Sequence, residues 1–293
     1  MGGAIQTDGQ GSVKHFACVF WVGRPATRGI MPSMNQSPVS SPSLALTAAP
    51  RIWVSGPLVV GRCFALPVPS AIHVARALRL VVGDALTLFD GGGGEYSAQI
   101  RSVRKDCVEV EVCGHCPVER ESTLRIRLIQ CLQGGDKMDF TIQKAVELGV
   151  DEIVPVISRR SVVRLDGGRA GKRVEHWRQV VVAASEQCGR NRLARVGDIE
   201  AFDRWLAHPV ADVTSRLLLS PHADQTVASI FSATRPVGVE LLIGPEGGLT
   251  PEEVEVALAQ KFCGLRLGPR VLRTETAGLA AIAALHAHWG DFI

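Results

Sequence analysis

The spacing of hydrophobic residues changes along the chain, and this change predicts two folded parts with different architectures. Between residues 51 and about 119, apolar and polar positions alternate over short runs, which is typical of strands. Residues 84–90 and 95–103 form two such runs on either side of the glycine-rich segment 90–94, which predicts a hairpin. A further strand is predicted over 107–113, and helical spacing predicts a helix over 70–80. We therefore expect this first part to be a small β-barrel.

From residue 123 onward, predicted strands and helices alternate, which is typical of an α/β protein with a parallel sheet. Strands are predicted over 124–132, 152–157, 217–219, 237–243 and 262–267, and helices over 136–148, 174–187 and 275–289. The first two helices each have an apolar side that should face the sheet. These sides consist of Phe140, Ile142, Ala145, Val146 and Leu148, and of Val174, Trp177, Val180, Val181 and Ala184. The last helix is almost wholly apolar, so we expect it to be buried.

The first 50 residues differ in composition from the rest. The Ser/Pro-rich run 37–43 is typical of disordered chain, so we expect residues 1–50 to form a disordered extension. The apolar run 15–22 is only marginally long enough for a signal peptide and no clean cleavage region follows it, whereas the scarcity of acids leaves a transit peptide as an alternative. We predict that deleting residues 1–48 leaves the melting temperature and turnover intact. A large loss of either would show that the extension is functional.

The segment 241–253 combines a buried strand, a glycine-rich turn and a helix start. Gly244, Gly247 and Gly248 permit unusual backbone angles and allow a ligand to approach the main chain closely. Thr250 is a suitable N-cap for the following helix, and Glu253 completes a capping box. The segment matches neither of the nucleotide patterns GxxxxGKS/T and GxGxxG. It therefore predicts either a binding site at the end of a strand or a tight turn without a ligand.

A second segment, 265–277, repeats this order of short strand, Gly-Pro turn and polar helix start. Together, IGPEGGLTPEE (243–253) and LRLGPRVLRTETA (265–277) resemble the S-adenosylmethionine site of the RsmE-type ribosomal RNA methyltransferases, within the SPOUT superfamily. The resemblance covers about residues 51–290. It implies methylation of the uracil N3 position of a uridine in small-subunit (16S) ribosomal RNA.

The same resemblance implies an architecture and a set of partners. A PUA-like RNA-binding β-barrel would occupy residues 51–120, and an α/β SPOUT methyltransferase domain with a C-terminal deep trefoil knot would occupy residues 121–293. The expected cofactor is S-adenosyl-L-methionine and the expected partners are 16S ribosomal RNA or the small ribosomal subunit and a second copy of the chain, with no metal and no membrane, in the cytoplasm. The residues that the resemblance assigns to the cofactor are Leu219, Ile243, Gly244, Pro245, Glu246, Gly247, Gly248, Leu267, Gly268, Val271, Leu272, Thr274 and Ala277.

Methylation of uracil N3 requires a group that removes the N3 proton or stabilises the developing anion. The motif 186–191 is similar to a family motif and offers a carboxylate, a guanidinium and an amide in Glu186, Arg190 and Asn191. Arg273 and Glu275 stand in the second glycine-proline segment. We expect Arg190 and Arg273 to stabilise the anion or hold a phosphate, and either Glu186 or Glu275 to be the base. Structural roles are the alternatives, with Glu275 capping the last helix and Glu186 pairing with Arg190.

Positive charge is concentrated in one part of the chain. The formal net charge is +3, but residues 159–195 contain ten Arg or Lys and only three acids, which is a local net charge of +7. Such a segment suggests a polyanionic partner or, alternatively, a solvated helix face. Lys137, Arg159, Arg160 and Arg164 are expected to contact RNA phosphates, as charge on strand ends and loops would. The resemblance to a PUA-like domain implies further RNA contacts at Arg51, Arg76 and Arg79 of the barrel. An RNA-binding module without catalysis, and methylation of another base or of a ribose 2′-hydroxyl, are the alternative functions.

Cys113 and Cys116 have the CxxC spacing found in redox and zinc sites. A redox site of this type needs a helix after the first cysteine, but Pro117 follows and no helical pattern does. No second CxxC or matching His pair is present to complete a zinc site. We therefore interpret residues 113–116 as a linker with reduced thiols, and a thiol oxidoreductase stays an alternative function. No apolar run approaches the roughly 20 residues that a membrane span needs.

Overall fold

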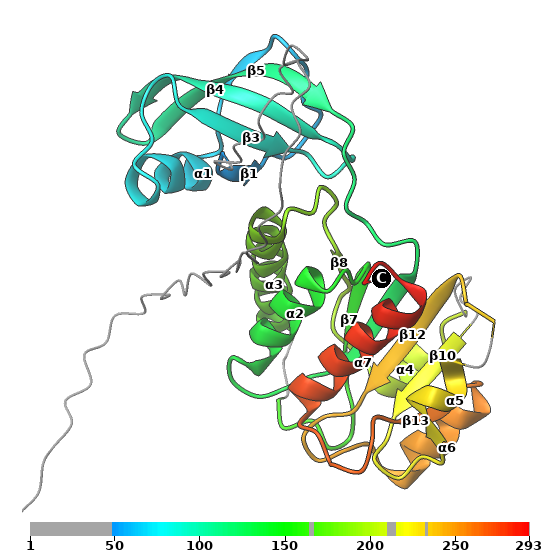
Figure 1. The fold of residues 1–293 in the computed structure, drawn as a ribbon. Coiled ribbons are helices and arrows are strands. Elements are labelled where there is room, and N and C mark those ends of the chain that lie inside the picture. Colours follow the sequence, from blue (N-terminus) through cyan, green and yellow to red (C-terminus); the bar gives the residue numbers. More distant parts are fainter. Residues whose placement is uncertain (1–48, 164–166, 210–214, 232–233, 293) are drawn as a thin grey trace, which may run out of the picture. The chain divides into compact units, whose positions relative to one another are not determined.

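The computed structural model describes residues 49–163, 167–209, 215–231 and 234–292. The expected N-terminal extension therefore lies, except for its last two residues, outside the described residues. Two sheets organise the described chain, one of five strands and one of eight (Figure 1).

The five-stranded sheet has the strand order β1-β3-β4-β5-β2. Strands β3 and β4 pair antiparallel across residues 90–94, so the predicted hairpin is confirmed. The inward side chains of the strands pack with a short helix over a core that includes Ile52, Leu88, Ile100 and Val110. The elements are β1 (Arg51–Trp53), β2 (Cys63–Ala65), α1 (Val68–Ile72), the π-helical turn η1 (His73–Ala77), β3 (Ala85–Phe89), β4 (Glu95–Arg104) and β5 (Cys107–Cys116).

The prediction that residues 113–116 form a linker was wrong. Strand β5 continues to Cys116, which lies opposite Glu95 of β4. The register between β4 and β5 shifts between Ser97 and Ala98, so one residue of β5 is unpaired there. Such a bulge puts the side-chain alternation out of phase, which is why the hydrophobic pattern stops before the strand does.

The eight-stranded sheet has the order β11-β13-β10-β12-β6-β7-β8, with β9 also paired to β7, and its pairs are parallel. The predicted parallel α/β architecture is confirmed. Its strands are β6 (Arg125–Cys131), β7 (Glu152–Ile157), β8 (Arg195–Val196), β9 (Glu200–Ala201), β10 (Ser215–Leu219), β11 (Gln225–Thr226), β12 (Gly238–Ile243) and β13 (Cys263–Arg266). Its helices are α2 (Lys137–Glu147), α3 (Gly167–Cys188), α4 (Phe202–Leu206), α5 (Val227–Phe231), α6 (Pro251–Ala259) and α7 (Thr274–Trp289).

Helices cover both faces of this sheet, which explains why the residues of its central strand are buried without alternation. All six residues of β12 are buried. On one face, side chains of α2, α3 and α7 such as Ile142, Trp177 and Ile282 form one core with the strands, and on the other face Phe202 of α4 and Ala257 of α6 belong to a second core. Among the described residues, no helix is both long enough and apolar enough to cross a membrane.

Two expectations about helix burial were wrong. Phe140 is 47% exposed, because the inner side of α2 is formed by Met138, Thr141, Ile142, Ala145 and Val146. A polar threonine takes a position that the apolar pattern did not predict. Helix α7 is buried only along one side, which includes Ala281, Ile282 and Leu285. Its apolar residues Leu279, Ala280, Ala283 and Ala284 are half-buried, and Ala287 is exposed.

Candidate functional site

Three chain segments meet at the carboxyl edge of the eight-stranded sheet. Strand β10 lies between β12 and β13, with Leu218 opposite Leu242 and Leu219 opposite Leu265. Neighbouring parallel strands end at the same edge, where ligands of α/β sheets usually bind. The segments 243–250 (the first loop) and 267–273 (the second loop) therefore flank the end of β10. Leu219 is the last residue of β10, at this edge. The other expected cofactor residues lie in the two loops or in the first turn of α7: Ile243, Gly244, Pro245, Glu246, Gly247, Gly248, Leu267, Gly268, Val271, Leu272, Thr274 and Ala277.

The glycines of these loops satisfy different structural requirements. A Cβ at Gly244 would lie 3.2 Å from a backbone nitrogen of the same loop, and a Cβ at Gly247 would lie 3.3 Å from the Cβ of Arg160. Packing of the protein itself thus accounts for these two. Gly248 and Gly268 instead have positive φ angles, +69° and +125°, and none of the described atoms lies within 4 Å of where their Cβ atoms would stand. Backbone conformation accounts for glycine there, with open space beside the main chain.

A hydrogen bond joins the two loops. Thr274 follows the second loop as the first residue of α7, and its Oγ1 donates to the carbonyl oxygen of Gly244 at 2.6 Å. The Nε2 atoms of Gln130 and Gln133 donate to the same hydroxyl at 3.2 and 3.4 Å. Neither glutamine is among the site residues predicted from the sequence. The sequence signal that could have identified them is their position at the end of an apolar strand, with Gln130 inside β6 and Gln133 just after it. A buried amide there needs hydrogen-bond partners.

Polar contacts also hold the outer part of the first loop. The Oε1 atom of Glu246 accepts hydrogen bonds from the backbone nitrogen of Gly134 and the Nζ of Lys137, each at 3.2 Å. Burial alone would raise the pKa of the Glu246 carboxyl, but backbone donors and the Lys137 ammonium together lower this pKa below its ordinary value. The Nη1 of Arg160 donates to the Gly247 carbonyl oxygen at 3.0 Å. Two residues expected at RNA, Lys137 and Arg160, thus contact the first loop.

Two expected catalytic residues flank Thr274. Arg273 is the N-cap of α7 and its side chain is exposed. Glu275 lies in the first turn of α7, and its Oε2 is buried without a hydrogen-bond partner among the described residues. A buried carboxylate oxygen without a donor is costly, so the site is suited to a ligand that supplies one.

Arg190 lies at the other edge of the sheet. It is 5% exposed, and its guanidinium donates to both carboxylate oxygens of Glu121 and to the carbonyl oxygens of Val146 and Val150. Val150 comes just before β7, so these contacts are at the amino edge, away from the two loops. These bidentate and backbone contacts hold the guanidinium in one position inside the protein. The alternative that Arg190 pairs with Glu186 was wrong, since its partner is Glu121.

The other two candidate residues of the 186–191 motif, Glu186 and Asn191, contact the strand β1. The Oε1 of Glu186 accepts a hydrogen bond from the backbone nitrogen of Trp53 at 2.9 Å, and the Oδ1 of Asn191 accepts one from Arg51 at 2.5 Å. Burial raises the pKa of the Glu186 carboxyl, and the Trp53 donor only partly opposes this. Within one chain, the structure does not bring this motif together with Arg273 and Glu275.

Comparisons with known proteins match both parts of the chain. Residues 120–286, more than half of the chain, match the family model described as an RNA methyltransferase domain, and residues 71–113 match an RNA methyltransferase PUA domain. The ribosomal RNA small subunit methyltransferase E of Bacillus subtilis is 36% identical over 218 residues, which are 73% of this chain and 85% of that protein. The chain belongs to this methyltransferase family. The enzyme of the same name from Buchnera aphidicola is 31% identical over 83% of this chain and 97% of its own length.

A solved structure supports the same assignment. The ribosomal RNA small subunit methyltransferase E of Neisseria gonorrhoeae, bound to S-adenosyl methionine, is 40% identical and has a TM-score of 0.78. The similarity covers 84% of this chain and all of that one. The predicted fold class, an α/β methyltransferase of the SPOUT type preceded by a PUA-like domain, is confirmed.

In this family member, the arginines expected at RNA have different surroundings. Arg51 donates to Glu95 at 2.6 Å and lies over the Phe89 ring, 5.0 Å from its centroid, so it is held in place. The exposed Arg76 bonds to Asp106 at 2.8 Å, and exposed Arg79 adopts a φ of +55° just after the helical turn. Arg159 is exposed, 3.8 Å from exposed Glu252. Arg164 lies outside the described residues.

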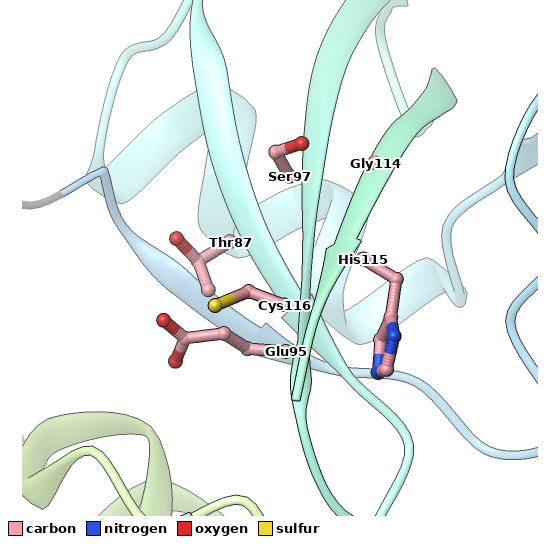
Figure 2. A pocket seen from close by; sticks show the side chains of 6 residues that line it. All are labelled: Thr87, Glu95, Ser97, Gly114, His115 and Cys116. Carbon is pink, nitrogen blue, oxygen red and sulfur yellow. The ribbon is translucent and has the colours of Figure 1, made fainter. Parts of the chain in front are cut away.

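A hollow of about 200 Å³ lies on the five-stranded sheet and includes one cysteine of the CxxC pair. Thr87, Glu95 and Cys116 project to one side of the strands, whereas His115 projects to the other (Figure 2). Both Cys113 and Cys116 are exposed and lie in a strand, so neither stands at the helix N-terminus that activates a redox thiol. The described part of the chain holds no group of three or more His, Cys, Asp or Glu residues arranged to bind a metal.

Proposed function

We propose that this protein transfers a methyl group from S-adenosylmethionine to the uracil N3 of a specific uridine in 16S ribosomal RNA. The observation that carries the proposal is the pair of loops at the carboxyl edge, joined through Thr274 and Gly244, in a chain 40% identical to an enzyme solved with S-adenosyl methionine. The open space beside Gly248 and Gly268 leaves main-chain groups accessible to the cofactor. When bound, the cofactor supplies an electrophilic methyl group on a sulfonium.

The chain must then hold uracil in line and receive its N3 proton. We assign the role of proton acceptor to Glu275. Its buried Oε2 has no hydrogen-bond donor among the described residues, and the residue lies in the first turn of α7, directly after the second loop. The new bond forms from N3 to the methyl carbon as the bond from that carbon to sulfur breaks, and the carboxylate keeps the proton. Exposed Arg273, two residues away, stabilises the negative charge that develops on the base. Glu186 and Arg190 act structurally in this proposal.

A direct test is to incubate the protein with labelled cofactor and small-subunit ribosomal RNA or subunits, then digest the RNA and analyse the nucleosides by mass spectrometry. Labelled N3-methyluridine is expected. Methyl on a ribose or on another base would overturn the assignment of the target atom, and RNA binding without methyl transfer would favour the module without catalysis.

We predict that RNA binding weakens steeply with salt, because each neutralised phosphate releases counterions. Arg160 contacts the first loop, Arg159 contacts Glu253 of α6 just after that loop, and Arg164 follows them in sequence. The triple replacement by glutamine should therefore reduce the slope of log affinity against log salt by about 2–3. Filter binding between 50 and 300 mM salt measures this slope. An unchanged slope would remove these arginines from the RNA interface.

We predict a homodimer. One side of α7 supports this prediction, because its residues Leu279, Ala280 and Ala283 are only half-buried. Phe140 of the neighbouring helix α2 is also exposed. A second copy would cover this apolar surface. Light scattering at micromolar concentration should show twice the chain mass of 31.4 kDa, and a species of the single-chain mass would contradict the prediction.

The proposed organisation follows the family. Residues 51–120 form the PUA-like RNA-binding domain and residues 121–293 the methyltransferase domain, with a deep trefoil knot formed by the C-terminal loops. Ribosomal RNA as substrate assigns the enzyme to the cytoplasm.

A further inference from the structure

The hydroxyl of Thr274 has a defined direction. It lies 2.6 Å from the carbonyl oxygen of Gly244 and receives the amide nitrogens of Gln130 and Gln133. A hydroxyl has one hydrogen to donate and two lone pairs to accept with. Because both amide nitrogens can only donate, the lone pairs of Thr274 are used by them and its hydrogen points at Gly244.

The direction of Gln133 is defined in turn by Thr141 of α2. Thr141 is fully buried, and its Oγ1 donates to the Oε1 of Gln133 at 2.9 Å, which leaves the Nε2 of Gln133 facing Thr274. Three successive hydrogen bonds thus lead from Thr141 through Gln133 and Thr274 to Gly244. We call these three side chains the relay. Hydrogen bonds arranged head to tail polarise one another, and this effect is largest away from water.

Helix α2 holds the first loop at a second point. Lys137 is four residues before Thr141, on the same side of the helix, and it donates to Glu246. The helix therefore contacts one end of the loop through the relay and the middle of the loop through Lys137. The relay residues are at most 8% exposed, whereas the Lys137 side chain is 35% exposed and its ion pair is weakened by solvent. Of the two attachments, the relay is the one able to determine the shape of the loop.

We propose that Thr141 and Gln133 are positioning residues for the cofactor. They act through Thr274 and set the position of the Gly244 carbonyl, and with it the shape in which the first loop receives the cofactor. This inference rests on the proposed function. Without the relay, the loop adopts more conformations before binding, and cofactor binding has to order it. Affinity should then fall, whereas turnover with saturating cofactor should change little.

The test measures cofactor affinity by calorimetry and turnover with ribosomal RNA for Thr141→Val, which keeps the side-chain shape and removes the hydroxyl. We expect the dissociation constant to rise about tenfold, since one buried hydrogen bond is lost and the Gln133 oxygen is left without a donor. The turnover number should stay within about twofold. Thr141→Ser restores the hydroxyl and should recover the wild-type constant to within about twofold.

The matched control is Ser185→Ala, which removes a buried hydroxyl from α3 that has no hydrogen-bond partner among the described residues. It should leave cofactor affinity unchanged. A folded Thr141→Val protein that binds the cofactor as tightly as wild type would overturn the inference. If Thr141→Val does not fold, Gln133→Asn, whose shorter amide cannot join Thr141 to Thr274, decides by the same criterion. A wild-type protein that binds no cofactor would instead refute the proposed function.

Discussion

Replacing Gly248 by valine should weaken cofactor binding by about 100-fold or more while the protein remains folded. The φ of Gly248 is +69°, a conformation that costs an L residue about 1–2 kcal/mol and a β-branched residue more. The loop can avoid this strain only by changing shape, and the new side chain would also fill the open space beside the main chain. Calorimetric titration with S-adenosylmethionine measures the effect. Gly248 is a sharper test than Gly247, where a side chain would also press on Arg160.

The control for backbone strain is Gly83→Val. Gly83 precedes β3 in the five-stranded sheet, has a φ of +95° and likewise has no described atom within 4 Å of its Cβ position. Its replacement should lower stability without changing cofactor affinity. Gly248→Asn should be tolerated better than valine, because asparagine adopts positive φ more readily. Equal losses of affinity at Gly83 and Gly248 would show that the effect is a general destabilisation.

Glu275→Gln should lower the turnover number by about 10²–10⁴, the usual contribution of a general base, and should preserve cofactor affinity. The amide keeps the shape of the side chain but cannot accept the N3 proton. Raising the pH should partly restore the rate, because more of the uracil is then already deprotonated. Single-turnover kinetics with saturating cofactor, measured over a range of pH, separates the chemical step from binding.

The same substitution at the other candidate carboxylate is the control. Glu186 accepts a hydrogen bond from the Trp53 backbone nitrogen, and the amide oxygen of a glutamine can still accept it. Glu186→Gln should therefore turn over at nearly the wild-type rate. A large loss in Glu186→Gln together with a normal rate in Glu275→Gln would assign the base to Glu186.

Local sequence signals predicted helices and strands well where neighbouring residues in the sequence determine the structure. The helix start at Thr250 has a full capping box, with Thr250 Oγ1 accepting from the Glu253 nitrogen and the Glu253 carboxylate accepting from the Thr250 nitrogen. The strand predicted over 237–243 from a mostly apolar run is β12, which begins one residue later and is buried on both faces. These features depend on neighbours within a few residues, which the sequence displays directly.

Misassignments arose where distant residues decide the outcome. Phe140 fits an apolar pattern, yet Thr141 takes the inward position because Gln133 accepts its hydroxyl hydrogen. The strand β5 runs on to Cys116 because β4 pairs with it past a bulge. Neither partner can be identified from the spacing of residues along one segment.

The sequence alone determined the two sheet types, the two loops that form the candidate site and the family, because these depend on local periodicity and on short motifs. Only the tertiary structure decided how the candidate residues are distributed. The parallel order of β10, β12 and β13 brings the two loops to one edge, whereas the buried contacts of Arg190 with Glu121 hold that arginine at the other edge. Hydrogen bonds between segments far apart in the chain, such as Thr274 to Gly244, have no sequence signature, since their geometry exists only after the sheet has assembled.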